Sequence, residues 1–127
     1  MSEKSVAAKL LIKENYRVLF IDQPEGYLQQ IGGLPPGVTV LNNLKENIDL
    51  IQLFVTSKNQ LEIQLPGLKK MLTPRGLLWV TYPKGTSKVK TDINRDTIWR
   101  YVQTLTMTAN SMISIDDTWS AMRVKFL

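Results

Sequence analysis

Residues 48–55 read IDLIQLFV, and residues 72–83 read LTPRGLLWVTYP. These two stretches decide the fold class. The first is apolar except at Asp49 and Gln52, and the second ends in the apolar run 77–82. Nearly continuous runs of β-branched, aromatic and leucine residues are typical of strands buried on both faces, which occur in parallel sheets covered by helices. We therefore predict two central parallel strands, at 48–55 and 77–82.

The segment between these strands carries a helix signal. Ser57 is followed by Gln60 at the third position after it, which fits the capping box at a helix start. We predict a helix from residue 58 to about residue 72, with a kink or break at Pro66 because proline removes a backbone donor. A turn at 74–76 then leads into the next strand.

The N-terminal part of the chain extends the same pattern. Residues 5–12 have helical spacing, and 16–22 (YRVLFID) form another buried strand. A short helix at 25–31 and a short strand at 38–41 (VTVL) follow. Only the polar linker 42–47 joins that strand to the next, although a parallel crossover usually takes a dozen residues. We expect the linker to cross in extended form unless the short strand is misplaced.

The C-terminal part adds a loop at 83–90, a helix capped by Thr91 or Asp92 that ends near residue 105, and a hairpin that turns at Asp116-Asp117. The predicted hairpin strands are 111–115 and 118–126. Strands that alternate with helices argue for an α/β fold. We predict three Rossmann-like layers: a mostly parallel sheet of about six strands, an antiparallel C-terminal hairpin, and helices on both faces.

Composition limits the class of protein. The 127 residues suit one domain, 1–127, and no apolar run is long enough to span a membrane. The first residues carry charges and lack a signal peptide's apolar region, so we expect a cytoplasmic protein. The chain has no cysteine and no histidine, which excludes thiolate and histidine metal sites, Ser-His-Asp triads and Cys-His dyads. We predict no catalytic residues and no metal site.

The loop 83–92 is the leading candidate site. It leaves a parallel strand at the edge where ligands bind in open α/β sheets, and it enters a helix whose amides favour anions. The predicted anion-binding residues are Asp22, Lys84, Gly85, Thr86, Ser87, Lys88, Lys90, Asp92 and Arg95. The alternatives are a solvated loop and, for Asp22, a helix cap.

Two other groups of residues have a structural interpretation that outweighs the functional one. Asp116 and Asp117 are a carboxylate pair, but aspartate at a tight turn favours local backbone hydrogen bonds. Trp79, Trp99 and Trp119 fit core or interface packing better than base stacking.

The chain resembles the class I methyltransferase fold. VLFID at 18–22 is similar to the family's first strand, residues 48–83 to its fourth strand, helix, Pro-Gly turn and fifth strand, and the terminal hairpin to its paired last strands. The resemblance implies a glycine-rich loop after the first strand, but residues 22–26 read DQPEG. It also implies a ribose-binding acid after the second strand, where Asn42-Asn43 stand, and a further β-α unit that is missing.

The chain is also similar to a group of small bacterial proteins classed as a domain of unknown function, which end in an Asp-Trp-Ser segment like residues 117–120. Because the cofactor features are missing, we expect no cofactor and in particular no S-adenosylmethionine (SAM).

The leading interpretation is therefore a non-catalytic binding or regulatory domain on a degenerate methyltransferase-like scaffold. One alternative is a phosphate or nucleotide binder, or an enzyme, that uses loop 83–92. A second is weak nucleic-acid binding through the same loop. The partners we expect are an anionic small molecule or a protein, and the composition is compatible with a homodimer.

Overall fold

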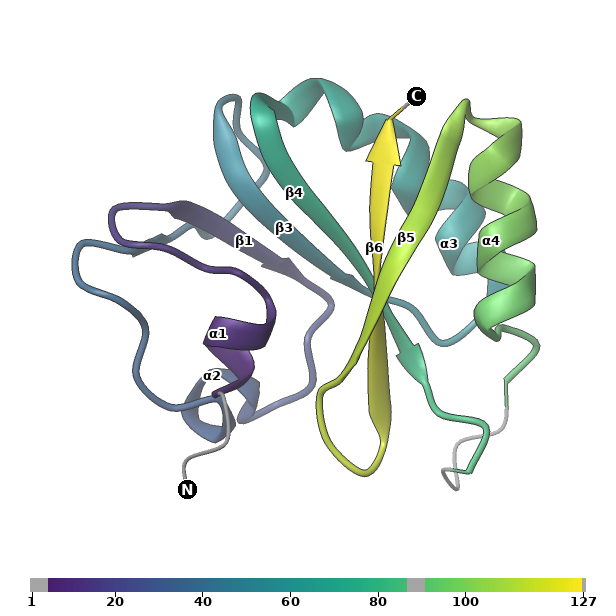
Figure 1. Cartoon of the computed structure of the whole chain (residues 1–127), viewed down its shortest axis with the longest axis horizontal. Coiled ribbons are helices and arrows are strands. Elements are labelled where there is room, and N and C mark those ends of the chain that lie inside the picture. Colours follow the sequence, from purple (N-terminus) through teal and green to yellow (C-terminus); the bar gives the residue numbers. More distant parts are fainter. Residues whose placement is uncertain (1–4, 87–90, 127) are drawn as a thin grey trace.

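The structure is a computed structural model that describes residues 5–86 and 91–126. Six strands form one sheet in the order β2-β1-β3-β4-β6-β5 (Figure 1). The strands are β1 (Arg17–Ile21), β2 (Thr39–Val40), β3 (Ile48–Phe54), β4 (Leu72–Pro83), β5 (Met107–Ser114) and β6 (Trp119–Phe126). The helices are α1 (Val6–Lys9), α2 (Tyr27–Gln30), α3 (Lys58–Gln64) and α4 (Arg95–Thr104), with 3₁₀ turns η1 (Leu65–Gly67) and η2 (Lys69–Met71).

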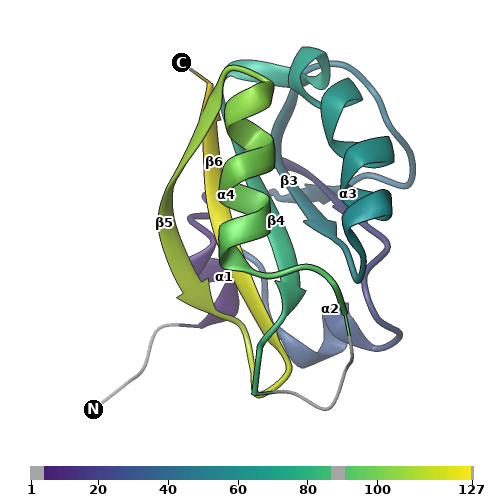
Figure 2. The same ribbon diagram turned by 90° about the vertical axis from the view of Figure 1, so that its right-hand side faces the viewer.

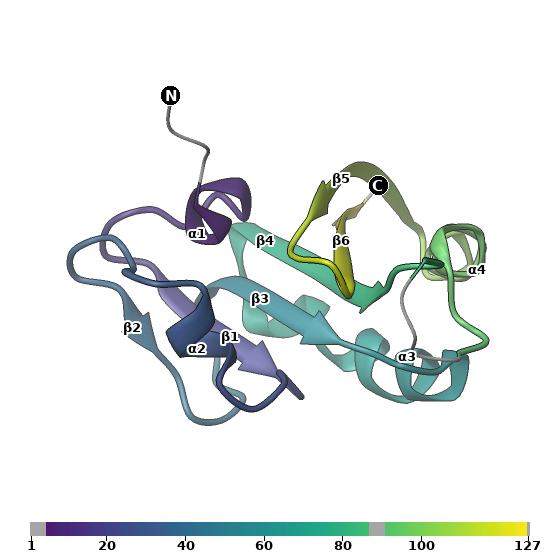
Figure 3. The same ribbon diagram turned by 90° about the horizontal axis from the view of Figure 1, so that it is seen from below.

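Strands β2, β1, β3 and β4 are parallel, whereas β6 is antiparallel to β4 and to β5. In Figure 3 the arrows of β1, β3 and β4 point the same way. The predicted α/β fold class, with its mostly parallel sheet and C-terminal hairpin, is confirmed. Strands β2 and β3 both pair with β1 and not with each other, so the linker between them crosses over β1, with bends at 42–43 and 46–47 and no helix.

Side chains alternate along each strand, so both faces of the sheet carry apolar side chains, and helices cover both faces. Leu19 of β1 packs in a cluster with Leu61 of α3 and Ile98 of α4. Its neighbour Phe20 packs in the other cluster, with Ala7 of α1 and with Tyr27 of α2. Figures 1 and 3 show α3 and α4 close together, away from α1 and α2.

Several predicted boundaries were wrong. The helix after Ser57 ends at Gln64 instead of near residue 72, because Pro66 breaks it into 3₁₀ turns. The predicted turn at 74–76 is an irregularity inside the longer β4, where its pairing with β3 shifts register. Strand β5 begins at Met107, four residues earlier than the predicted 111, because pairing with β6 supports a polar segment that has little strand character of its own.

A buried chain of hydrogen bonds crosses the α1/α2 face of the sheet. The Tyr27 hydroxyl donates to Gln52 Oε1 at 2.8 Å, and Gln52 Nε2 donates to Thr81 Oγ1 at 3.0 Å. All three residues are almost completely buried, and burial raises the pKa of the Tyr27 hydroxyl well above its ordinary value. The chain therefore ties the short helix α2 to the two central strands, with each buried polar group satisfied by a partner.

Candidate functional site

The parallel strands β1, β3 and β4 end at the same edge of the sheet, the carboxyl edge. Asp22 follows β1, Thr56 follows β3 closely, and Lys84 follows β4. In open α/β sheets this edge is where ligands bind. Polar residues gather at two parts of this edge, the end of β1 and the end of β4.

At the end of β1, the carboxylate of Asp22 is held by two amide side chains. Gln60 Nε2 and Gln64 Nε2, both on α3, donate to Asp22 Oδ2 at 3.1 and 2.7 Å. Asp22 has a left-handed backbone (φ 58°) and an exposed side chain. It does not cap the following helix, because the N-cap of α2 is Gly26 and no side chain bonds there.

The turn from β1 into α2 has no glycine-rich loop. Gly26 provides the left-handed conformation (φ 80°) at the start of α2, and the Tyr27 amide is bonded to the Pro24 carbonyl at 3.1 Å. Pro24 itself has no amide hydrogen. The backbone donors that a glycine loop would turn toward a ligand are therefore few in this turn.

Beside β1 lies a cavity of about 340 Å³. It lies between the linker that follows β2 and the end of α3 with its 3₁₀ turn, over β1. Its lining is apolar along β1 and polar around the rim, and comprises Leu19, Phe20, Ile21, Asp22, Asn42, Asn43, Leu44, Gln64, Gly67 and Leu68. The volume lies at the lower end of the range for small-molecule sites, about 300–1,000 Å³.

At the end of β4, the polar groups are bound to the C-terminal hairpin. The Lys84 amide donates to the Thr118 carbonyl at 2.7 Å, and Lys84 Nζ donates to Ser114 Oγ at 2.6 Å. Gly85 and Thr86 follow as exposed turn residues. Lys84 thus joins β4 to the turn between β5 and β6.

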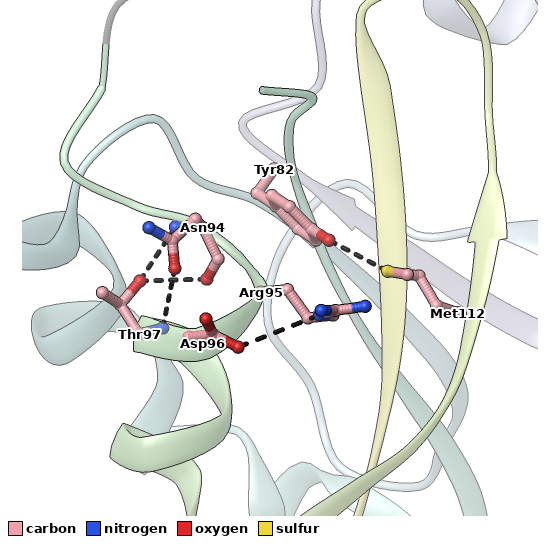
Figure 4. Close-up of polar contacts among 6 residues, drawn as sticks. All are labelled: Tyr82, Asn94, Arg95, Asp96, Thr97 and Met112. Atoms are coloured by element: carbon pink, nitrogen blue, oxygen red, sulfur yellow. Dashed lines mark hydrogen bonds and ion pairs between the residues drawn. The ribbon is translucent and has the colours of Figure 1, made fainter. Parts of the chain in front are cut away.

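The sequence predicted that Thr91 or Asp92 caps α4, but neither residue does so. Asp92 Oδ1 accepts from the Lys58 amide at 2.8 Å, at the first turn of α3, and the Thr91 hydroxyl donates to the Thr56 carbonyl. The N-cap of α4 is Asn94, in a reciprocal capping box with Thr97 (Figure 4). The physical reason is that the chain runs alongside α3 before α4 begins, so Asp92 reaches the nearer helix end.

The predicted anion-binding residues are thus divided. Asp22 and Asp92 both contact α3, Lys84 contacts the hairpin, and Arg95 lies on the exposed first turn of α4. Ser87, Lys88 and Lys90 lie outside the described residues. The sequence reasoning missed Gln60, Gln64, Asn42 and Asn43 at the end of β1, although the i, i+4 spacing of the two glutamines already placed them on one helix face.

The turn interpretation of Asp116 is confirmed. Its Oδ1 accepts from the amides of Thr118 and Trp119, both at 2.8 Å, and its Oδ2 accepts from Gln30. Burial opposes ionisation of this carboxyl, but these hydrogen bonds and the charge of Lys84 together lower its pKa below the ordinary value. In the described parts of the chain, no three His, Cys, Asp or Glu residues are grouped as a metal site would need.

The tryptophans differ. Trp79 is buried and its Nε1 donates to the Leu10 carbonyl at 2.9 Å, and Trp119 packs edge to face on Phe54. Trp99 is 45% exposed, so it does not belong to the core.

No protein-family model and no curated protein sequence matches this chain. Solved structures do match. A complex of DhpI with SAH superposes with a TM-score of 0.64 at 10% identity, covering 94% of this chain and 82% of that one. A complex of DhpI with SAM and HEP gives 0.62 at 10% identity, covering 94% and 84%. A SAM-dependent methyltransferase from Aquifex aeolicus gives 0.61 at 15% identity, covering 95% and 89%.

The chain therefore has the Rossmann-like fold of class I SAM-dependent methyltransferases, as the resemblance implied. Two expectations are contradicted. The interpretation as a non-catalytic domain, with its phosphate-binding and nucleic-acid-binding alternatives, does not agree with matched structures that include SAM-dependent methyltransferases. The expectation that SAM is not a cofactor does not agree with two matched structures that are complexes with SAM or SAH. Both expectations rest on the missing glycine loop, whereas the fold of the whole chain is retained without it.

The described residues contain no helix long and apolar enough to cross a membrane.

Proposed function

We propose that this chain binds SAM at the end of β1 and transfers its methyl group to an acceptor. The observation that supports this most is the likeness over 94% of the chain to structures that hold SAM or SAH, together with the likeness to a SAM-dependent methyltransferase from Aquifex aeolicus. A second supporting observation is the cavity beside β1, which lies near the carboxyl edge of the sheet, where ligands bind in open α/β folds.

The residues at the end of β1 fit the adenosine part of such a ligand. The cavity has an apolar floor along β1 (Leu19 and Ile21) for a flat ring, and Asn42 and Asn43 at its rim carry amides for hydroxyl groups. Asp22 brings a carboxylate to the same rim. Small-molecule sites commonly combine an apolar lining with a few polar groups that fix orientation.

The amino-acid part of SAM would lie near the carboxylate of Asp22 and not, as in a glycine-rich loop, near several backbone amides. Asp22 is the nearest anionic group, and a carboxylate attracts an ammonium group or a sulfonium charge. Gln60 and Gln64 hold that carboxylate through side-chain hydrogen bonds on an exposed surface, so a ligand can replace one of them at small cost. When bound, SAM supplies a methyl group on positively charged sulfur, and the chain's residues bind and orient it.

The acceptor belongs, in this proposal, beside loop 83–92. The segment from Lys84 to Arg95 carries four basic residues and one acid, and it follows the strand next to β3 at the same edge. A surplus of positive charge concentrates anionic ligands near it. We therefore propose an acceptor with an anionic group.

The proposal is tested by isothermal titration with SAM and with SAH, using the whole chain. We expect saturable binding of both, weakened at least about tenfold when Asn42 and Asn43 are both replaced by alanine, since a tenfold change needs only about 1.4 kcal/mol. Asn59→Ala, an exposed asparagine on α3, is the matched control and should bind like the wild type. Absence of any binding heat and of any thermal stabilisation at millimolar ligand would refute the proposal.

A further inference from the structure

The strongest unassigned feature is a groove between the first half of α4 and the outermost strand, β5. Its volume is about 350 Å³. Two of the most exposed large apolar side chains line it, Trp99 (45% exposed) and Met112 (47% exposed). The other lining residues are Arg95, Asp96, Ala109, Asn110, Ser111 and Met122. Exposed apolar residues gathered beside one groove, with a polar rim, mark an interaction surface.

The sheet also ends at this groove. Among the described residues, β5 pairs only with β6, so its outer edge carries backbone groups without a strand partner (Figure 2). A bulge interrupts the ladder between Ala109 and Ser111. The bulge divides the edge into two regular segments, 107–109 and 111–114, of which the second carries Met112.

The charges of the groove favour a second copy of the same chain. Among the described residues, Arg95 and Asp96 are the only charged ones that line it, one of each sign. Arg95 Nε lies 3.9 Å from Asp96 Oδ1, and both side chains are mostly exposed, so each keeps room for another partner (Figure 4). Whereas the whole chain carries a net charge of +5, which repels a second copy, this surface is neutral.

A two-fold interface places the same surface on both partners. Such an arrangement brings Arg95 of each copy to Asp96 of the other, and it brings Trp99 and Met112 of both copies together. Met112 is held for this contact, since its sulfur accepts a hydrogen bond from the largely buried Tyr82 hydroxyl at 3.0 Å (Figure 4).

We infer that this surface, formed by the first half of α4 and by β5, is the interface of a two-fold homodimer. The inference does not depend on SAM binding, because none of these residues lines the cavity beside β1. A partner of different chemistry, such as an acidic peptide, fits the neutral groove less well than it fits the basic remainder of the surface.

The test is the mass in solution, measured by light scattering and sedimentation over a concentration series. We expect a wild-type dimer and a monomer for Met112→Glu. Asp96→Arg should raise the dimer Kd at least about tenfold, because like charges then face each other twice across the axis. The double reversal Arg95→Asp with Asp96→Arg should restore the dimer, since the exchanged pair is complementary again.

Ile63→Glu is the matched control, because Ile63 is 71% exposed on α3, away from the groove. It should leave the mass unchanged. Circular dichroism of each variant confirms that α4 still forms. A wild-type monomer at every concentration, a dimer that persists in Met112→Glu and Asp96→Arg, or a double reversal that stays monomeric would each overturn the inference.

Discussion

The two parts of the carboxyl edge, at the ends of β1 and β4, use similar polar residues in different ways. At the end of β1, Asp22 is bonded only to the side-chain amides of Gln60 and Gln64, beside a cavity. At the end of β4, Asp92 is bonded to a helix backbone amide and Lys84 to the C-terminal hairpin. Side-chain partners on a surface can be exchanged for a ligand, whereas a backbone group at a helix start needs its cap.

This difference assigns the two carboxylates different roles. We expect substitutions at Asp22 to act on ligand binding, and substitutions at Asp92 to act on stability. Loop 83–92 looked like the better site in the sequence because its charges are concentrated there. The structure shows that one of its polar residues, Asp92, completes α3.

The largest expected effect concerns the buried hydrogen bonds that run from Tyr27 through Gln52 to Thr81. Gln52→Leu leaves the hydroxyls of Tyr27 and Thr81 buried without a partner, so the free energy of unfolding should fall by about 3 kcal/mol. Urea denaturation measures it. Gln103→Leu, on the exposed side of α4, should change stability by less than about 0.5 kcal/mol. If both variants behave alike, the buried chain does not tie α2 to the central strands.

The next effect is on affinity. Asp22→Asn, which keeps a residue that tolerates the left-handed backbone, should lower the affinity for SAM at least about tenfold, about 1.4 kcal/mol, because the only carboxylate among the described residues that line the cavity is lost. Its free energy of unfolding should change little, since its hydrogen bonds are on the surface. Titration calorimetry checks the first statement and urea denaturation the second. An unchanged affinity would move the ligand away from the end of β1.

Asp92→Ala should show the reverse behaviour. Loss of the acceptor for the Lys58 amide should cost about 1 kcal/mol of stability, the usual cost of removing a helix cap. The affinity for SAM should stay within about twofold of the wild type, because Asp92 does not line the cavity. A strong loss of affinity without loss of stability would show that Asp92 acts in ligand binding as Asp22 does.

The smallest effect concerns the hairpin turn that Lys84 contacts. The pKa of Asp116 is lowered in the folded state, so its charge stabilises the fold above the ordinary value of 3.8, and this contribution is lost as the pH falls through the lowered pKa. Asp116→Asn should therefore be less stable than the wild type at neutral pH, by less than about 1 kcal/mol because the group is partly exposed. The difference should disappear in acid. Denaturation at a series of pH values measures it, and a difference that persists in acid would show that the charge has no part in it.

Much of the fold was predictable because it depends on local patterns. The buried strands were visible as apolar runs, and the cap at Ser57 was visible as Ser followed by Gln; its hydroxyl accepts from the Gln60 amide at 3.1 Å. The boundary errors were greatest where a neighbour supplies the stabilisation. Residues 107–110 form a strand only because β6 pairs beside them.

The candidate site was less predictable, because its residues come from distant parts of the chain. Asp22 and Gln64 are 42 positions apart, and Asp92 and Lys58 are 34 apart. No periodicity connects such pairs. Trp99 also has helical spacing with core residues, yet it is exposed because its side of α4 extends beyond the sheet's apolar surface to the groove.

The sequence by itself determined the order of strands and helices, the two apolar faces of the sheet and the exclusion of histidine and cysteine chemistry, since these depend on residue type and on spacing within one element. Only the tertiary structure decided which carboxylate caps a helix, where the linker leaves a cavity and which tryptophan stays exposed. Those features depend on contacts between segments far apart in the chain, and these contacts form only when the sheet brings the segments together.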